Sequence, residues 1–548
     1  MSLTSPHAAL TASPDSASPG RTDFVRRWAT SPWLAVCVGL LVVSFFILRW
    51  SRTSPGYDPY GWLDWGYQAI RGTINIKGAP SWKPITFLFT LPYSIFGHLS
   101  WWMWRVTSLA FALGGPVAGG LIGYRLVKRD GRPVWPAWIA AAFAGVGIVM
   151  IVQYWHYILS SQSDPMLVTF VLIAYNQLLS KRYGWSITFL VACGLGRPEV
   201  WVPLGLLWLW TFWKVPRLRG LLVFYVALMA FLWFGLPVVF GAPWNIAQKL
   251  AQHSVRELHH NQFLGTLGRF IHLSEWPALT AAAGTLVWAV LRRDLAVVGV
   301  GVLAILWMVV EEWFVLSNGF PGVPRYMFEA AAATIVLGAV GVGWLAEVAA
   351  GGPPIPAGAA WSLRSRILQE PAADPASVAA PTGGDPTPPS RGPAGRRPHL
   401  ALRGLSAVVA VALIAFMVPD ARAGWDWEHK DILNERNRTH SIYTLSRAID
   451  AAGGARFIRS CGVPTVDVGT ASILAWYTHL NTAQVGYIPA KQIRLGGPVV
   501  LFTGLFNGWV LHTYNLHGAA AARCARLQNA YFLETRGHPS GEFFHLSH

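Results

Sequence analysis

Apolar runs long enough to cross a lipid bilayer recur along this 548-residue chain, and they constrain its fold more than any other feature. A transmembrane helix needs about 20 mostly apolar residues, because its backbone polar groups must be satisfied without water. Eleven runs approach or reach this length, the fifth and sixth being short: 32–50, 101–127, 134–152, 166–179, 184–196, 200–213, 221–240, 278–291, 295–316, 326–349 and 402–418. With 53% hydrophobic and only 13% charged residues, the composition excludes a large soluble enzyme. We therefore predict an α-helical polytopic membrane protein with about 11 transmembrane helices.

Lysine and arginine cluster in every second connection between these runs, for example at 128–132 and 214–219. Cytoplasmic connections carry such an excess, so we predict a multi-pass protein of the cell membrane with a cytoplasmic N-terminal tail, residues 1–31. The loop 51–100 and the tail from residue 419 then face outward. The net charge of +17 is explained by this bias beside anionic lipid, and we expect no nucleic-acid partner.

The chain divides at a segment rich in proline, alanine and glycine, residues 350–400. Such a composition cannot bury a core, so we expect a disordered cytoplasmic linker. It separates a transmembrane module, 32–349, from a last transmembrane helix, 401–419. Residues 420–548 are predicted to form a small extracytoplasmic α/β domain.

Within that domain the pattern predicts a helix ending at Gly453-Gly454, a second helix over 471–480, and strands at 464–469, 483–489 and 498–504. Cys461 and Cys524 both lie in this outward region, where an oxidising environment favours pairing, and they are candidates for one disulfide. No cysteine or histidine cluster has zinc spacing. The domain's simplest role is a structural cap or acceptor platform.

The loop after the first apolar run is too polar and turn-rich to be a simple connector. Asp58 lies fourteen residues before Gly72, and Lys83-Pro84 opens an aromatic segment that ends at Phe96-Gly97. The loop thus brings a base, a turn and a cation to one boundary between water and membrane. Because Pro59 disfavours the helical conformation in the residue before it, we expect Asp58 to precede the helical run 60–70.

Three further motifs follow these along the chain: Arg105 opens a span, Asp164 begins another in SSQSDPML, and Arg325-Tyr326 precedes a long span in VPRYMFEA. The set resembles the GT-C glycosyltransferases, in particular the protein O-mannosyltransferase and lipid A aminoarabinose transferase-like enzymes (family 39-like), over roughly residues 32–349. The chain departs from the pattern at Pro59, where the family often has glutamate, and at Trp82, where aminoarabinose transferases carry glutamate. The missing carboxylate argues against a divalent metal requirement.

The resemblance implies transfer of a sugar from a polyprenyl-phosphate donor to an acceptor hydroxyl outside the membrane, with inversion. A carboxylate can take the acceptor proton, and Asp58 is the first choice for this base. Lys83 and Arg325 can neutralise the leaving phosphate. Asp164, placed by the resemblance in the cavity, would orient the acceptor or a cation. The alternatives are that Asp58 caps a helix and that Lys83 and Arg325 reach to lipid headgroups.

Further candidates for substrate contact lie in outward-facing segments or at the ends of the apolar runs: Asp64, Tyr154, His156, Tyr157, Arg256, His260, Glu311, Glu312 and Tyr326. Aromatic residues at the membrane surface also form interfacial belts. The loop that contains Arg256 and His260 can equally be a solvated helix. Adjacent acids in an apolar span need a wet cavity or a basic partner, which favours a role for the glutamate pair.

Two other functions fit the same sequence. A lipid or glycan transporter or flippase would need a route through the midplane, and no inverted repeat indicates one. A non-catalytic GT-C-like scaffold of envelope assembly would keep the fold without the transfer reaction. The sequence specifies neither the sugar (mannose, arabinofuranose, galactose and aminoarabinose donors share one lipid-phosphate handle) nor whether the acceptor is a glycan, lipid or protein.

Overall fold

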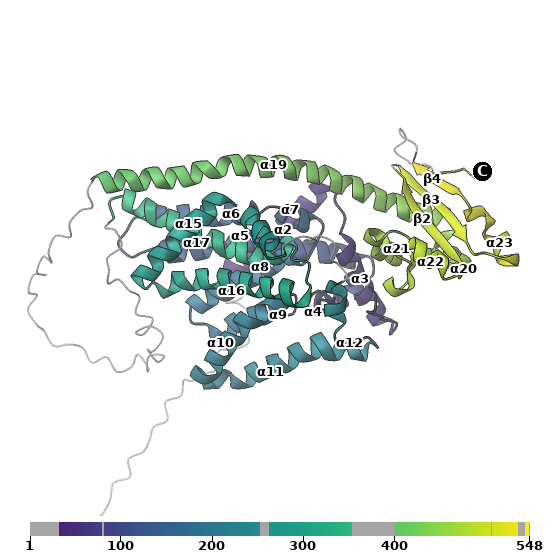
Figure 1. Ribbon diagram of the computed structural model, residues 1–548, viewed down its shortest axis with the longest axis horizontal. Coiled ribbons are helices and arrows are strands. Elements are labelled where there is room, and N and C mark those ends of the chain that lie inside the picture. Colours follow the sequence, from purple (N-terminus) through teal and green to yellow (C-terminus); the bar gives the residue numbers. More distant parts are fainter. Residues whose placement is uncertain are drawn as a thin grey trace, which may run out of the picture.

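The computed structural model describes residues 32–78, 82–252, 262–352, 400–505, 507–534 and 543–546, and it is mainly helical (Figure 1). The N-terminal part holds α2 (Pro32–Ser51), α3 (Tyr57–Ile70), α4 (Pro84–Tyr93), α5 (Leu99–Val127), α6 (Trp135–Val149), α7 (Tyr154–Leu159) and α8 (Asp164–Leu179). The middle holds α9 (Tyr183–Gly194), α10 (Trp201–Lys214), α11 (Arg219–Ala230), α12 (Leu236–Val239), α13 (Ile246–Gln252), α14 (Gln262–Ser274), α15 (Trp276–Arg292), α16 (Leu295–Asn318) and α17 (Phe328–Ala349). The long α19 (Leu400–Ala451) leads to a C-terminal domain with a sheet.

Each of the eleven predicted apolar runs coincides with a helix, but the count of eleven spans is not confirmed. Among the described residues, six helices are long and apolar enough to cross a membrane by length and composition: 32–51, 99–127, 216–239, 295–317, 324–349 and 401–451. Four further apolar helices, including α6 and α8, have between 10 and 17 residues. Their shortness is the reason that composition alone does not settle how many of them span.

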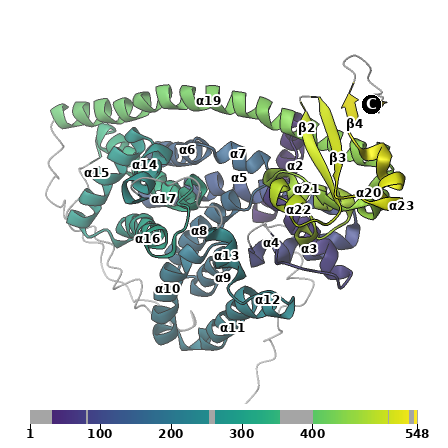
Figure 2. The ribbon, with the colours of Figure 1, turned by 45° about the vertical axis from the view of Figure 1, so that its right-hand side comes forward.

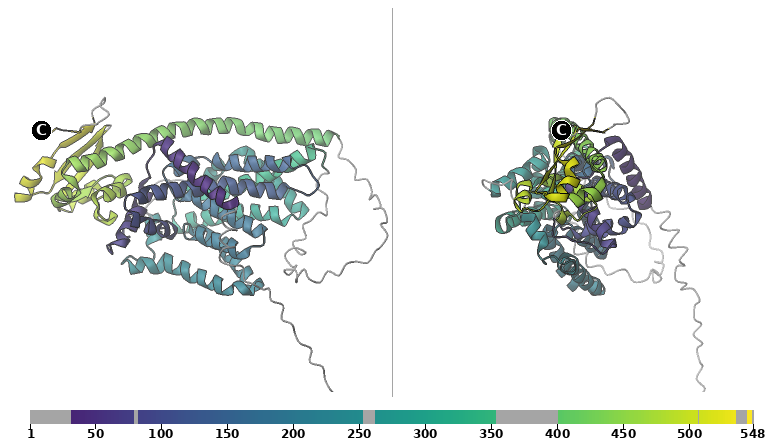
Figure 3. Two further views of the ribbon diagram at one scale, coloured as in Figure 1. Left: turned by 180° about the vertical axis from the view of Figure 1, so that it is seen from behind. Right: turned by 90° about the vertical axis from the view of Figure 1, so that its right-hand side faces the viewer.

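The bundle is built around α17. In its most apolar stretch of 18 residues, 83% of the residues are buried, whereas in the corresponding stretch of α2 only 17% are buried. Figure 3 shows α2 lying on the outside of the bundle. Small residues let α17 approach its neighbours closely, as is common between membrane helices. A Cβ added at Gly341 would lie 2.0 Å from the Thr285 hydroxyl of α15, and one at Gly338 would lie 2.9 Å from the Ala278 carbonyl oxygen.

The helix α19 continues past residue 419, where the last predicted span ends. It runs unbroken for 52 residues through Pro419, so the last predicted span and the helical stretch before Gly453 are one element. At 1.5 Å per residue it is about 78 Å long, more than twice the hydrocarbon thickness of a bilayer. It ends where Gly453 and Gly454 take positive φ values of 107° and 82°.

The C-terminal domain has a five-stranded sheet in sequence order: β1 (Val463–Thr465), β2 (Val499–Leu505), β3 (Gly508–Tyr514), β4 (Ala530–Glu534) and β5 (Phe543–Leu546). The pair β1–β2 is parallel, with Val463 opposite Val499, and the later pairs are antiparallel. The predicted strand 483–489 is wrong: this segment makes one isolated bridge, between Gly486 and Thr465. Its first residues belong to a 3₁₀ turn, 482–484.

Short helices pack around the sheet, namely α20 (Gly454–Cys461), α21 (Ala471–Thr478), α22 (Pro489–Arg494) and α23 (Gly518–Cys524). Cys461 and Cys524 form a disulfide with a Cα–Cα distance of 5.8 Å. The domain lies at one end of the bundle, with α21 close to α3 (Figure 2). Tyr60 of α3 packs against the rings of Trp476 and Tyr477 there.

Candidate active site

Asp58 lies in the first turn of α3, which begins at Tyr57, three residues before the predicted helical run 60–70. The helix tolerates proline here because the amide groups of a first turn have no helical partner to lose. The Gly56 amide just before α3 donates to the Ser160 carbonyl at 2.7 Å, which fixes the start of the helix. The Asp58 side chain is 12% exposed, so the carboxylate is largely enclosed but reachable.

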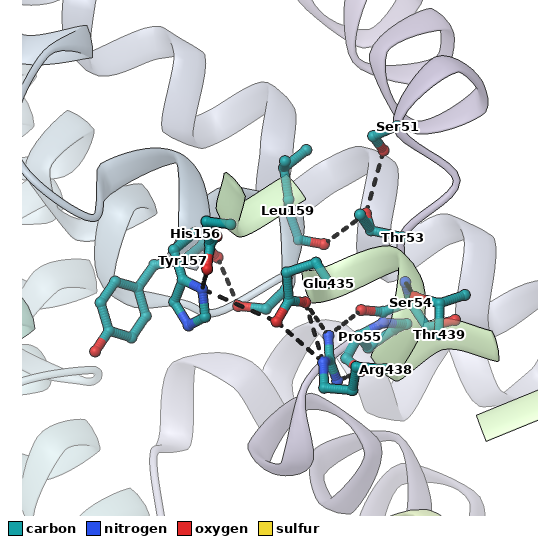
Figure 4. A network of polar contacts seen from close by, with 12 residues as sticks. Ser51, Thr53, Ser54, Pro55, His156, Tyr157, Leu159, Glu435, Arg438 and Thr439 are labelled. Carbon is teal, nitrogen blue, oxygen red and sulfur yellow. Dashed lines mark hydrogen bonds and ion pairs between the residues drawn. The ribbon is translucent and has the colours of Figure 1, made fainter. Parts of the chain in front are cut away.

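The loop before α3 is held by α19, from the other end of the chain (Figure 4). The Ser54 amide donates to the Thr439 hydroxyl at 2.7 Å. The Arg438 guanidinium donates to the carbonyl oxygens of Ser54 at 2.7 Å and Pro55 at 2.8 Å. These bonds join residues more than 380 positions apart, and they set the path of the chain into Asp58.

Asp164 begins α8 and is the anion at the centre of the site. Its side chain has no exposed surface, and its Oδ1 accepts from Lys83 Nζ at 3.0 Å and from the Arg197 guanidinium. The Lys83 ammonium also donates to the Ser163 hydroxyl at 3.1 Å. Lys83 is the residue before α4, and Pro84 occupies the first position of that helix. One buried carboxylate therefore holds two cations from separate segments.

Arg325, in a 3₁₀ turn (Pro324–Met327) before α17, completes the group. Its Nη1 lies 3.6 Å from Asp58 Oδ2, and its guanidinium lies 5.7 Å from the ring centroids of both Tyr157 and Tyr326. The Arg325 Nε is buried and has no hydrogen-bond partner among the described residues. Asp58, Lys83, Asp164 and Arg325, chosen from the sequence, thus converge from α3, α4, α8 and the turn before α17.

Arg197 and Glu199 belong to the same group and were not among the sequence candidates. They lie in the Arg-Pro-Glu break between α9 and α10, where Pro198 starts a 3₁₀ turn. Arg197 stacks on Tyr326 at 3.7 Å, and its Nη1 lies 3.6 Å from Glu199 Oε1. An arginine and a glutamate between two apolar helices are the signal that could have identified them.

Further carboxylates surround Arg197. Burial raises the pKa of Glu199, and the charge of Arg197 opposes that shift. Glu311, from α16, lies beside Glu199, and Glu329, from the first turn of α17, also interacts with Arg197. The carboxylate oxygens of Glu311 and Glu329 are buried without a hydrogen-bond partner among the described residues. The sequence predicts that the glutamate pair needs a wet cavity or a basic partner, and Arg197 is a cation whose charge acts on Glu311.

The other candidates lie elsewhere. Tyr154 is fully buried, and its hydroxyl donates to the Ala112 carbonyl at 2.9 Å, which is a packing role. His156 Nδ1 lies 3.0 Å from Asp431 Oδ2 of α19. Burial lowers the pKa of His156, but the hydrogen bond and charge of Asp431 outweigh burial and raise it overall. Glu312 lines an apolar groove of about 610 Å³ between α14, α15 and α16.

Asp64 lies on α3 but lines a different cavity, between α3 and the C-terminal domain. Gln68 Nε2 donates to Asp64 Oδ2 at 2.6 Å, and burial raises the pKa of Asp64 to about 8. Arg256 and His260 lie outside the described residues. Within the described ranges, no three histidine, cysteine, aspartate or glutamate side chains are arranged to hold a metal ion.

Comparison with known proteins gives a limited result. No family model matches the chain, and no curated protein matches it. Two solved structures are similar, both of ArnT from Cupriavidus metallidurans. The apo structure is 14% identical, with a TM-score of 0.41 over 86% of this chain and 93% of that one. The structure bound to undecaprenyl phosphate is 15% identical, with a TM-score of 0.41 over 92% and 97%. A TM-score this low does not establish a common fold.

Proposed function

We propose that this chain is an integral membrane glycosyltransferase of the GT-C kind. It transfers a sugar from a polyprenyl-phosphate donor to an acceptor hydroxyl at the outer face of the membrane, with inversion at the anomeric carbon. Asp58 is the general base. The observation that carries the proposal is the pairing of one reachable carboxylate, Asp58, with Arg325 at 3.6 Å, beside the buried Lys83–Asp164–Arg197 group.

The reaction is a single displacement. The acceptor oxygen forms a bond to the anomeric carbon as the bond from that carbon to the phosphate oxygen breaks, and the phosphate leaves with the electron pair. The acceptor proton moves to Asp58, which must lie within hydrogen-bond reach of the hydroxyl. Arg325 and Lys83 neutralise the charge that grows on the leaving phosphate.

The two aspartates support this division of roles because their surroundings differ. Asp164 has no exposed surface, and its Oδ1 is shared by Lys83 and Arg197, so it acts as a fixed counter-ion that orients these cations. Asp58 is partly exposed, and the Arg325 guanidinium with which it pairs is 3.6 Å away. Arg325 retains an Nε donor without a partner among the described residues, and that donor is available to a phosphate oxygen.

The test is reconstitution of the purified chain in liposomes with four polyprenyl-phosphate donors that carry mannose, arabinofuranose, galactose or aminoarabinose. Release of polyprenyl phosphate is measured with and without an envelope glycan fraction as acceptor. We expect one donor to be consumed only when acceptor is present, and Asp58→Asn to abolish that consumption. Donor that crosses the bilayer without being consumed would instead show a flippase. A chain that neither consumes nor moves any of the four donors would contradict the proposal.

A further inference from the structure

A cavity of about 480 Å³ lies between α3, the loop after it and the C-terminal domain, apart from the Asp58 group. Its walls are tied together by Gln68, whose Nε2 donates to the Leu480 carbonyl at 3.1 Å and whose Oε1 accepts from Asn481. The loop after α3 also packs tightly on the domain, since a Cβ at Gly78 would lie 2.7 Å from the Ala483 amide nitrogen. The cavity is therefore preformed by two parts of the chain.

The lining combines an aromatic wall with amide groups. Trp476, half-buried, is held by the rings of Tyr60, Tyr67 and His98 at centroid distances of 6.2 to 6.5 Å. Tyr67 and Trp476 both line the cavity, as do the side chains of Gln68 and Asn481. Rigid aromatic faces beside a few fixed polar groups suit the C–H face and hydroxyl groups of a sugar ring.

The charge of the cavity is positive. Arg71 and Arg459 line it, and both are exposed. Burial lowers the pKa of His479 on the same wall, and the positive charges of Arg459 and Arg71 lower it further. Asp64 is the one carboxylate among the described lining residues, and at a pKa of about 8 it is protonated at neutral pH.

The position of the cavity relative to Asp58 limits which part of a substrate can occupy it. Asp58 and Asp64 are six residues apart on one helix, which places them about 9 Å apart along its axis and about 240° around it. A group in the cavity is thus too far from Asp58 to react there, but it can belong to the same extended acceptor as the hydroxyl that does. Asp58 and Asp64 both belong to α3, which lies at the end of the bundle that meets the C-terminal domain (Figure 2).

We infer that this cavity binds an acidic saccharide segment of the acceptor, with Trp476 as the stacking surface and Arg71 and Arg459 as the partners of its carboxylate groups. The assignment of the cavity and the C-terminal domain to acceptor recognition rests on the proposed transfer reaction. The ligand class follows from the lining alone.

The direct test is calorimetric binding to the full chain in lipid nanodiscs, with tri-galacturonate as the acidic probe and maltotriose as the neutral one. Tri-galacturonate should bind about fivefold more tightly, because an ion pair with an exposed arginine contributes up to about 1 kcal/mol. Arg459→Ala, at an exposed position, should weaken tri-galacturonate binding roughly fivefold without affecting folding. Arg494→Ala, an exposed arginine of α22 that does not line the cavity, is the matched control and should bind as the wild type does.

Failure of this inference differs from failure of the transferase. If Arg459→Ala binds tri-galacturonate normally, or if neither probe binds, the acidic saccharide site is wrong, although transfer can still occur. In a transfer assay, Arg459→Ala should raise the KM for an acidic acceptor while kcat and the KM for donor stay unchanged. Asp58→Asn should lose turnover and still bind tri-galacturonate. An equal loss of both probes in Arg459→Ala would contradict recognition by charge.

Discussion

Replacing the two aspartates by asparagine should separate chemistry from structure. Asp58→Asn removes a base that is 12% exposed and whose cation lies 3.6 Å away. A partly exposed pair of this kind contributes about 1 kcal/mol or less to stability. The loss of a general base slows turnover about 10²- to 10⁴-fold, equivalent to about 2.7 to 5.4 kcal/mol of activation free energy.

Asp164→Asn should behave in the opposite way. Its carboxylate has no exposed surface, and neutralising it removes the charge with which Lys83 pairs and leaves Arg197 with Glu199, 3.6 Å away. Breaking a buried pair from one side costs about 3 to 5 kcal/mol of unfolding free energy. Asparagine keeps an oxygen that accepts a hydrogen bond, so we expect the lower end of that range, together with weaker donor binding because Lys83 loses its orientation.

The assay measures kcat, donor affinity and the thermal unfolding midpoint of both variants in the same detergent. Asp58→Asn should keep the wild-type midpoint and donor affinity but lose turnover, and Asp164→Asn should unfold at lower temperature. The reasoning is refuted if Asp58→Asn turns over normally, or if the two variants lose stability equally. A stable Asp164→Asn variant with slow turnover would transfer the catalytic role to Asp164.

Four more outcomes are expected. A phosphatase reporter, which is active only outside the membrane, should be inactive when it is inserted within 353–399 and active at the C-terminus; the same result at both positions would contradict the topology. Lys83→Ala and Arg325→Ala should each weaken donor binding by about 1.5 to 3 kcal/mol, roughly 10- to 150-fold, in a titration with labelled donor; unchanged affinity would assign them to lipid headgroups. The Asp64 carboxyl loses its proton near pH 4 in the unfolded chain, but burial raises its pKa to about 8 in the folded chain, so the stability of the wild type should fall as the pH rises from 4 to 8. The stability of Asp64→Asn should not change over this range. Thermal unfolding midpoints of the two proteins that run parallel from pH 5 to 9 would disprove this. Arg438→Ala should lower kcat more than donor affinity because the loop before Asp58 loses two hydrogen bonds, and an unchanged kcat would show that this clamp is dispensable.

Much of the bundle could be predicted because the hydrophobic pattern acts locally. Each apolar run contains enough residues to specify a helix by itself, and each coincides with one in the structure. The number of spans could not be predicted, since a helix such as α8, with 16 residues, can cross a membrane or end within the protein. The last predicted span and the helical stretch before Gly453 are separate in the sequence pattern, whereas α19 is continuous through Pro419.

The site was predictable where a charged residue stood alone against an apolar background. Asp164 and Arg325 each stand just before an apolar run, whereas Asp58 and Lys83 were identified within the polar loop 51–100, and the structure brings all four together. Arg197 has the same character but lies in a turn of three residues, which resembles a simple connector. Its importance depends on Asp164 and Tyr326, which are remote in sequence, and no local pattern reveals contacts of that kind.

The C-terminal domain is mechanically connected to the site through α19. The same helix that enters this domain at Ala451 carries Arg438 and Thr439, which bond the loop three to four residues before Asp58. One turn earlier, Glu435 pairs with Arg438, and Asp431 pairs with His156 of α7. A shift of α19 that breaks these bonds must therefore release the loop that positions Asp58. Because the domain also forms the wall of the saccharide cavity, an acceptor held there would stabilise the arrangement of α3 in which Asp58 faces Arg325.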